Sequence, residues 1–247
     1  MTIKSFLSLL LLCLPLFCYA KNTQIQSFSS SKHKLEKQVY ADQKERLTIY
    51  CQAHFDAKKN IIPEPGFESK KFAKRAKRVE WEHVVPAENF GRNFKEWRNG
   101  AKSCVNSKGK HYKGRRCANK ASEDYRYMQA DMYNLYPSIG SVNASRSNYN
   151  FTMLGNIKSD FGSCPMKIEN HKVEPPAASR GMIARSYLYM DSTYSSYKMS
   201  SQQRQLMNAW NNSYPITQWE CERAKRIQKV QGNVNEVVQK ACQIAGF

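Results

Sequence analysis

The cysteines constrain this chain more than any other residue type does. Eight are present, but Cys13 and Cys18 lie in an apolar N-terminal segment. None of the others forms a close Cys-x-x-Cys pair, the spacing typical of metal sites. An even number of separated cysteines in an exported chain indicates up to three disulfides. We predict one pairing, Cys104 with Cys117, whose short loop would contribute about 3 kcal/mol, and leave open how the rest pair. The full set is Cys51, Cys104, Cys117, Cys164, Cys221 and Cys242.

The first 20 residues are typical of a secretory signal peptide. They contain a single charged residue, Lys4, and an apolar run over residues 6–17. That run is too short for a membrane-spanning helix, and the bulky Phe17 argues against a lipid anchor on Cys18. We therefore expect cleavage after residue 20, no membrane anchor, and a periplasmic or secreted protein with one domain over residues 21–247.

The chain is strongly basic, with 39 lysines and arginines against 20 acidic residues and a formal net charge of +19. Three runs concentrate this charge: KKFAKRAKR (Lys70–Arg78), KGKHYKGRR (Lys108–Arg116) and ERAKRIQK (Glu222–Lys229). Any one run could be a solvated surface, but three in one exported chain predict a face that binds phosphate groups. None resembles an amphipathic membrane helix, which favours nucleic acid over a lipid surface.

The order of the sequence patterns predicts one helix-rich α+β domain. With 41% hydrophobic and 12% aromatic residues the chain can build a core. We expect a strand over residues 78–85, ending in a turn at Pro86, and a basic loop over residues 96–120. Residues 21–34 and the stretch GSVNASRSN (140–148) are predicted to be irregular. The expected helices cover residues 35–55, 123–136, 199–211, 215–231 and 233–242.

The stretch EWEH, Glu80 to His83, carries candidate catalytic groups at the end of the expected strand. In a regular strand Glu82 and His83 point to opposite faces, so they can serve one site only if the strand ends there, which Pro86 permits. A carboxylate is a hard ligand suited to Mg²⁺, and a neutral imidazole can take a proton from water. Such a pair could hydrolyse a phosphodiester. An ordinary polar strand with a surface histidine fits these residues alone equally well.

Further stretches carry a resemblance to a known family. EWEHVVPA, FGR, DMYNLYPSIGSVNASRSNYNF (Asp131–Phe151) and AKRIQKVQGNVN (Ala224–Asn235) resemble the endonuclease I family, in order, over about residues 39–242. The family consists of periplasmic or secreted bacterial nucleases with a ββα-metal, or His-Me finger, motif. The resemblance implies a disulfide-stabilised, helix-rich fold around that motif. It also implies a sequence-nonspecific endonuclease that hydrolyses DNA, with RNA as a second candidate substrate, and we expect a monomer.

The family's metal and base positions can be assigned residue by residue. The resemblance implies that His83 is the general base, and that Glu82 and Asn134 bind one Mg²⁺ ion, with other divalent cations as substitutes. A zinc enzyme fits less well, because zinc sites use several nitrogen or sulfur ligands. The alternative function is a cationic nucleic-acid-binding protein of the same fold without hydrolysis. The presence of all three residues favours the enzyme.

Other assignments stay open at this point. Glu80 is a candidate for hydrogen bonding to a metal-bound water or to the base, whereas Trp81 is expected to pack in the core. Arg146, in the same turn as Asn148, is a candidate for holding either the phosphate or the active-site loop. Lys102 stands where the family usually has an arginine, and lysine lacks the bidentate fork that grips a phosphate. The phosphate clamp is therefore Lys102 or Arg146.

Overall fold

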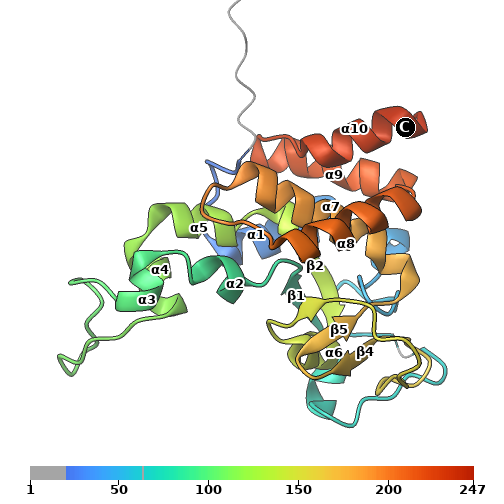
Figure 1. Ribbon diagram of the computed structural model, residues 1–247, viewed down its shortest axis with the longest axis horizontal. Coiled ribbons are helices and arrows are strands. Elements are labelled where there is room, and N and C mark those ends of the chain that lie inside the picture. The colour runs from blue at the N-terminus through green and yellow to red at the C-terminus, as the bar shows by residue number, and fades with distance from the viewer. Residues whose placement is uncertain (1–20, 63) are drawn as a thin grey trace, which may run out of the picture.

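The computed structural model describes residues 21–62 and 64–247, so the predicted signal peptide lies outside it. Four C-terminal helices lie together on one side of the molecule, and the β1–β2 strand pair lies beneath them (Figure 1). The bounds of these helices are α7 (Ala177–Thr193), α8 (Ser201–Ser213), α9 (Gln218–Gln231) and α10 (Glu236–Ala245). The helix-rich α+β class is confirmed.

The two strands at the centre are antiparallel. Strand β1 (Val79–His83) pairs with β2 (Leu135–Ile139), with His83 opposite Leu135. The prediction of β1 was therefore correct, but the predicted helix over 123–136 was wrong beyond Gln129. There α5 (Glu123–Gln129) gives way to the 3₁₀ turn η4 (Met132–Asn134) and then to β2.

Pro137 is compatible with β2 because of its register. The Gly140 amide donates to Arg78 O and the Val84 amide to Asn134 O, so the hydrogen-bonded pairs lie at even positions of β1. Pro137, opposite Trp81, therefore lies where the ladder requires no N–H. Pro137, before which the sequence predicted the end of a helix, therefore lies inside a strand.

The remaining elements are short. A second sheet has the order β3-β5-β4, in which β3 is parallel and β4 antiparallel to β5. The other bounds are α1 (Phe28–Lys34), η1 (Leu35–Val39), η2 (Gln43–Glu45), η3 (Ala73–Lys77), α2 (Ala87–Gly91), α3 (Lys95–Asn99), α4 (Arg115–Ala121), α6 (Gly140–Arg146), β3 (Asn150–Phe151), β4 (Lys167–Glu169) and β5 (Lys172–Glu174).

Four sequence-based predictions were wrong in these short elements. The loop expected over residues 96–120 contains helix at both ends, in α3 and α4. Residues 21–34 are ordered: the buried Asn22 amide donates to Ile25 O and Tyr127 O, and α1 follows. The helix predicted over 35–55 ends at Val39, apart from the short turn η2. Most of the stretch 140–148 forms α6, which ends at Arg146, and only residues 147–148 form a turn. In each case contacts with distant segments decide the local structure, and a polar sequence pattern does not reveal them.

Helices α8, α9 and α10 follow their sequence signals, as predicted, whereas α7 was not predicted. Ser200, Thr217 and Asn235 each accept a hydrogen bond from the backbone amide three residues ahead, which caps the start of α8, α9 and α10. Gly232 ends α9 in the left-handed conformation, with a φ of 82°.

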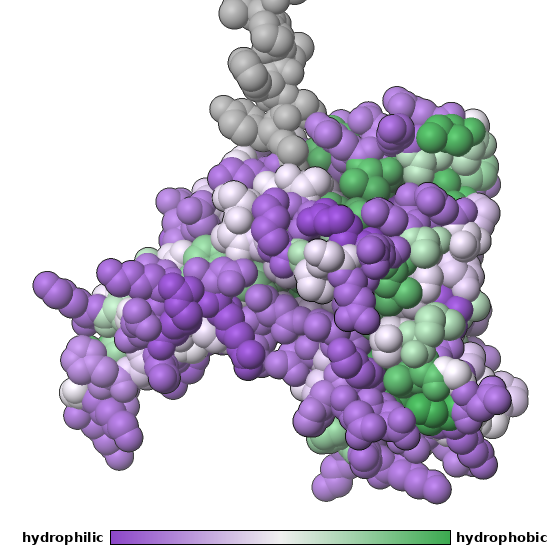
Figure 2. Space-filling model, viewed as in Figure 1, coloured by the Kyte–Doolittle hydropathy of each residue, from purple (hydrophilic) through white to green (hydrophobic). Residues whose placement is uncertain are grey.

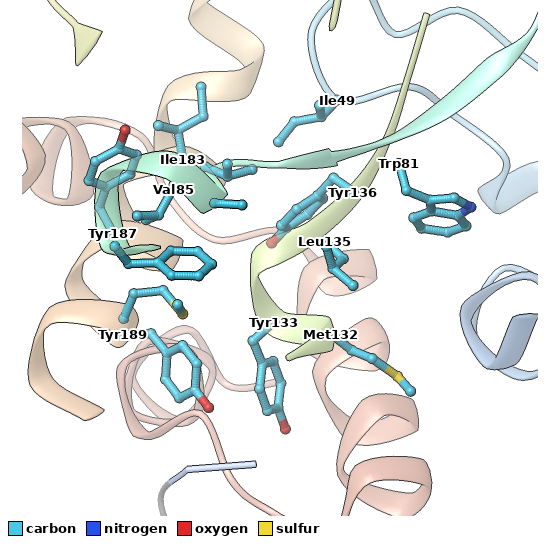
Figure 3. Close-up of a cluster of buried hydrophobic side chains, with 14 of the residues drawn as sticks. Ile49, Trp81, Val85, Met132, Tyr133, Leu135, Tyr136, Ile183, Tyr187 and Tyr189 are labelled. Atoms are coloured by element: carbon cyan, nitrogen blue, oxygen red, sulfur yellow. The ribbon is translucent and has the colours of Figure 1, made fainter. Parts of the chain in front are cut away.

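The core fixes the strand pair against α7. Figure 3 shows Leu135 and Tyr136 of β2 among buried side chains that include Ile183 and Tyr187 of α7. Trp81 of β1 is 8% exposed and donates its indole N–H to Glu36 Oε1 at 3.0 Å, which confirms its packing role. Strand β1, which carries EWEH, and its partner β2 therefore pack against a dense core.

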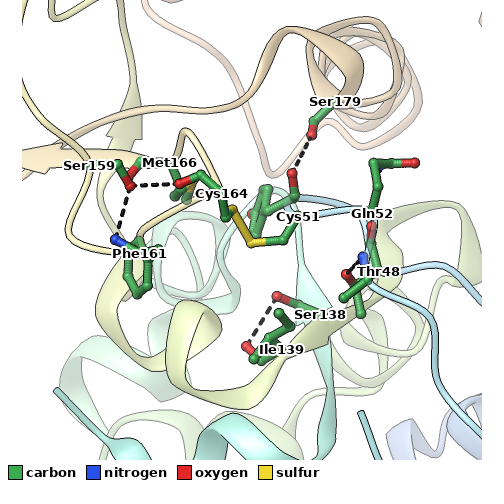
Figure 4. The surroundings of a disulfide bond; sticks show 12 residues. Thr48, Cys51, Gln52, Ser138, Ile139, Ser159, Phe161, Cys164, Met166 and Ser179 are labelled. Carbon is green, nitrogen blue, oxygen red and sulfur yellow. Dashed lines mark hydrogen bonds between the residues drawn. A yellow bond between two sulfur atoms is a disulfide. The ribbon is translucent and has the colours of Figure 1, made fainter. Parts of the chain in front are cut away.

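Three disulfides are present in the described residues, and the predicted Cys104–Cys117 pair is one of them. Cys221–Cys242 joins α9 to α10. Cys51–Cys164 links the segment after Tyr50 to the loop before β4; beside it, Ser179 of α7 donates to Ile49 O (Figure 4).

Residues 95–121 form an arm, which contains α3 and α4 and extends away from the helices (Figure 1). A hollow bordered by hydrophilic side chains separates this arm from the part that carries α6, β4 and β5 (Figure 2).

The third basic run, Glu222–Lys229, was expected to add to a phosphate-binding face, but its Arg223 lies in the core. Arg223 is 2% exposed and donates to the Tyr40 hydroxyl, Met132 O and Leu135 O. Within the described chain, no helix is both long and apolar enough to cross a membrane.

Candidate active site

His83 is the last residue of β1, and its ring is held in one orientation. Its Nε2 lies 2.8 Å from Gln129 O, and because a carbonyl only accepts, Nε2 carries the proton and Nδ1 keeps its lone pair. The Phe28 ring covers it with 4.7 Å between centroids. Burial, followed by the charge of Arg115, lowers the pKa of His83 to about 3. The side chain therefore has the neutral form that a general base needs.

Glu82 lies on the opposite face of β1 and is 3% exposed. Its Oε1 accepts hydrogen bonds from the Tyr50 hydroxyl at 2.5 Å and from Arg146 Nη1 at 2.9 Å. Its Oε2 accepts none from the residues that the structure describes. Burial raises the pKa of this carboxyl, although the charge of Arg146 and the Tyr50 hydrogen bond work in the opposite direction. One oxygen is thus fixed and the other remains available as a ligand.

Arg146, at the end of α6, holds the end of β1 in place. Its side chain is fully buried: Nη1 donates to Glu82 Oε1 and to His83 O, both at 2.9 Å, and Nη2 donates to Val84 O at 2.7 Å and to the Tyr187 hydroxyl at 3.3 Å. A phosphate cannot reach a side chain in this position. Of the two roles that the sequence left open, the geometry is that of a residue that holds the active-site segment.

Asn134 lies directly before β2 and contacts the segment that follows β1. Its Oδ1 accepts from the Val85 amide at 2.7 Å and its Nδ2 donates to Val85 O at 2.9 Å. The side chain is fully buried at the end of η4, a 3₁₀ turn rather than the expected helix. Because an amide oxygen has two lone pairs, Oδ1 can accept this hydrogen bond and still bind a cation.

Glu80 and Lys102 lie apart from these groups. Arg75 and Arg78 bind the Glu80 carboxylate, and although burial raises its pKa, the hydrogen bonds and charges of these two arginines lower it overall. Lys102 is exposed in the arm. Among the residues described, neither side chain has a hydrogen bond or ion pair with Glu82, His83 or Asn134.

The side-chain oxygens at this end of the strand pair suit Mg²⁺, the metal that the sequence predicts. The part of the chain that is described has no cluster of three or more His, Cys, Asp or Glu side chains suited to a metal. It offers Oε2 of Glu82 and Oδ1 of Asn134, two hard oxygens near the same end of the strand pair. Mg²⁺ commonly takes only one or two protein ligands and keeps several waters, so these residues fit it. Arg146 already pairs with Oε1, so the ion would use Oε2.

Positive charge surrounds this end of the sheet. Arg115 of α4 and Lys32 of α1 lie over the faces of Phe28, at 5.5 and 4.8 Å from its ring centroid. A cavity of about 1000 Å³ that reaches from Phe28 to the start of β1 is also lined by basic side chains. They include Lys32, Lys58, Lys59, Arg75 and Arg78.

Sequence reasoning missed Tyr50, Gln129 and Arg115. The first two reach Glu82 and His83 across sequence separations of 32 and 46 residues. No local pattern marks them as part of the site. Arg115 belongs to the second basic run, so its charge was visible in the sequence but its position beside Phe28 was not.

Comparison with known proteins agrees with these observations. Residues 16–242 match the family model described as Endonuclease I. An extracellular deoxyribonuclease of Aeromonas hydrophila is 39% identical, over 96% of this chain and 100% of the relative. A periplasmic deoxyribonuclease of the same species is 38% identical over 89% and 88% of the two chains. Endonuclease-1 of Buchnera aphidicola (subsp. Acyrthosiphon pisum) is 35% identical over 91% and 85%.

Proposed function

The chain belongs to the endonuclease I family, and from that premise we propose that it is a metal-dependent endonuclease that hydrolyses DNA without sequence specificity. It acts outside the cytoplasm, as the extracellular and periplasmic relatives do. The observation that carries the proposal is His83 at the end of β1, with Nε2 bound to Gln129 O and Nδ1 unprotonated, on a strand that also carries Glu82 and pairs with the segment after Asn134. We assign the pair and the following helix α6 to the ββα-metal class.

The chain's own residues divide the work of hydrolysis. His83 Nδ1 takes the proton of the attacking water, while Gln129 O keeps the ring in the required tautomer. Glu82 Oε2 and Asn134 Oδ1 would hold the metal. When bound, the metal neutralises charge that develops on the phosphate and the leaving oxygen. Arg146 keeps Glu82 Oε1 and the backbone after His83 fixed, so that ligand and base stay in register.

Substrate binding belongs to the basic surface rather than to the reacting groups. Phosphate contacts position a nucleic acid without reading its sequence. We assign this role to exposed cations of the arm, with Lys102 as the remaining candidate for a phosphate clamp, because Arg146 is buried. RNA offers the same phosphates, so we propose it as a second substrate.

The test is digestion of supercoiled plasmid and of a structureless RNA, with Mg²⁺, with excess chelator, and with Mg²⁺ restored. We expect nicked and then linear DNA with Mg²⁺, no product with chelator, and recovery on restoration. Mapped DNA ends should show no common sequence. Activity that persists in excess chelator would contradict the metal dependence. Tight binding without cleavage under every divalent cation would instead indicate a binding protein.

A further inference from the structure

A second cavity, of about 800 Å³, lies beside α6. Helix α6 connects it to the candidate active site: Arg146 points inward to Glu82, whereas its neighbours Ser145 and Ser147 line the cavity. The volume is within the range of about 300–1,000 Å³ that is usual for small-ligand sites. We propose that this cavity binds an unpaired nucleobase of the nucleic-acid substrate. The inference rests on the proposed nuclease function, which brings nucleic acid to this surface.

Aromatic side chains supply stacking surfaces in this cavity. Phe72 is 51% exposed and lines the cavity, and the guanidinium of Arg75 lies over its ring at 5.7 Å from the centroid. Tyr149 and His171 contact each other with 4.9 Å between ring centroids, and both line the cavity. Every base has a π-face, so such rings hold unpaired bases with little sequence preference.

Charged and polar groups around the rings match the other parts of a nucleotide. Lys70 and Lys71 precede Phe72 and can contact the phosphates on either side of a stacked base. Asp160 and Glu169 can accept hydrogen bonds from exocyclic amino groups, and Asn170 can donate or accept. In a duplex these base edges and faces are already occupied, so the cavity suits a base that is unpaired.

Several residues around the cavity have a positive φ. Six residues other than glycine have positive φ in the described chain, and four of them line this cavity. These are Phe72 (56°), Ser147 (55°), Asn170 (47°) and His171 (59°). Asn170 and His171 form the two-residue turn between β4 and β5, where positive φ is usual. For the bulky side chain of Phe72 a positive φ is costly, and such strain concentrates at binding sites. The conformation presents the Phe72 ring to solvent at the cavity instead of burying it.

The test measures binding in excess chelator, so that its outcome does not depend on hydrolysis. The probes are two fluorescein-labelled oligodeoxynucleotides of equal length, one with bases and one abasic throughout, which carry the same number of phosphates. By fluorescence anisotropy we expect the wild type to bind the base-containing strand about 5- to 150-fold more tightly. Equal affinity would assign the cavity to another class of ligand and overturn the proposal, even if plasmid cleavage is observed.

Variants locate this preference in the cavity. Phe72→Ala should remove most of the preference for the base-containing strand, whereas Phe72→Trp should retain it. The matched control is Phe247→Ala, a phenylalanine that is 48% exposed at the other end of the molecule, and it should behave like the wild type. Phe72→Gly relieves the positive φ, so its Tm should be unchanged or higher while the preference is lost. If Phe72→Ala and Phe72→Gly keep the wild-type preference, the proposal is wrong.

Discussion

At the residue scale, the site depends on how buried charges are balanced. Glu82 and Arg146 form an ion pair with side chains 4% and 0% exposed. Breaking such a pair is costly because the remaining charge has no compensation. His83 sits on the other face of the same strand, where burial and then the charge of Arg115 lower its pKa and keep it neutral. The two neighbouring residues thus differ in charge because the strand turns them to different surroundings.

Arg146 gives the first prediction. Arg146→Met should lower the free energy of unfolding by about 3–5 kcal/mol, because Glu82 is left buried and unpaired. Arg92→Met, which breaks the exposed i,i+4 pair with Glu88, is the matched control and should cost less than about 1 kcal/mol. Urea unfolding measures both. A similar cost for the two variants would contradict the account of the buried pair.

Arg146→Lys separates positioning from phosphate binding. It keeps the charge but not the two-pronged contact with Glu82 and the backbone after His83. We expect kcat to fall by about 10- to 100-fold, with the KM for DNA unchanged. An increase in KM at constant kcat would show that Arg146 binds the substrate instead.

The lowered pKa of His83 predicts how stability depends on pH. Below about pH 6.5 the histidine of the unfolded chain takes up a proton, whereas in the folded protein it stays neutral until about pH 3. The unfolded state then binds more protons, so stability is lost as pH falls through this window. Relative to His83→Gln, the metal-free wild type should lose on the order of 3 kcal/mol between pH 7 and pH 4.

Urea unfolding in chelator at several pH values measures this difference. His54→Gln, which removes an exposed histidine, should keep the wild-type dependence on pH. The raised pKa of Glu82 acts in the opposite direction but is common to all three proteins, so it cancels in the comparison. Parallel curves for the wild type and His83→Gln would show that His83 is not buried as a neutral ring.

At the element scale, one disulfide lies within the arm. The Cys104–Cys117 disulfide closes a loop with a sequence separation of 13. Few backbone hydrogen bonds cross the arm, and in one of them the Gly114 amide donates to Trp97 O. Arg115 and Arg116 follow directly, and Arg115 reaches over Phe28 beside His83. The disulfide therefore helps to fix the loop that places the charge of Arg115 near the candidate site.

Replacing both cysteines of this pair by alanine should cost about 3 kcal/mol and should weaken DNA affinity more than it lowers kcat. The matched control is the Cys221–Cys242 pair, with a separation of 21, which joins α9 and α10 away from the arm. Its double alanine variant should lose similar stability but keep the DNA affinity of the wild type. Equal losses of affinity in the two variants would mean that the arm has no special role in binding.

The sequence predicted elements that carry strong local signals. The capped C-terminal helices and strand β1 were correct, as was the short disulfide, because each depends on nearby residues. Strand β2 and α6 were not foreseen, since β2 contains Pro137 and α6 consists largely of small and polar residues. Their structure comes from pairing with β1 and from the buried Arg146. The proposed roles of Glu82, His83 and Asn134 came from family resemblance; their hydrogen-bond partners, such as Tyr50 and Gln129, required the fold.

At the scale of the whole molecule, the net charge of +19 is distributed unevenly. Part of the third basic run stabilises the core, while the first two runs lie on the part with η3 and on the arm, beside the hollow in Figure 2. A polyanion placed in that hollow would pass close to the end of β1. In the proposed function the charge serves binding, and the chemistry belongs to nearly buried groups.

This division predicts a strong effect of salt on affinity. A surface that contacts about 6–10 phosphates loses roughly 10³–10⁵ in affinity between 50 and 200 mM salt. Raising salt at fixed Mg²⁺ should therefore increase KM far more than it lowers kcat, as initial rates over a range of DNA concentrations can show. Affinity that does not change with salt would exclude the basic surface as the main binding site.

The most direct test of the central claim is His83→Ala, measured for cleavage and binding in the same preparation. With Mg²⁺ present, the rate of plasmid cleavage should fall by at least about 10²–10⁴-fold, the usual contribution of a general base. In chelator, affinity for DNA should stay within about twofold of the wild type, because the basic surface is intact. Cleavage at the wild-type rate by the folded variant would contradict the assignment of His83 as the base and with it the proposed site.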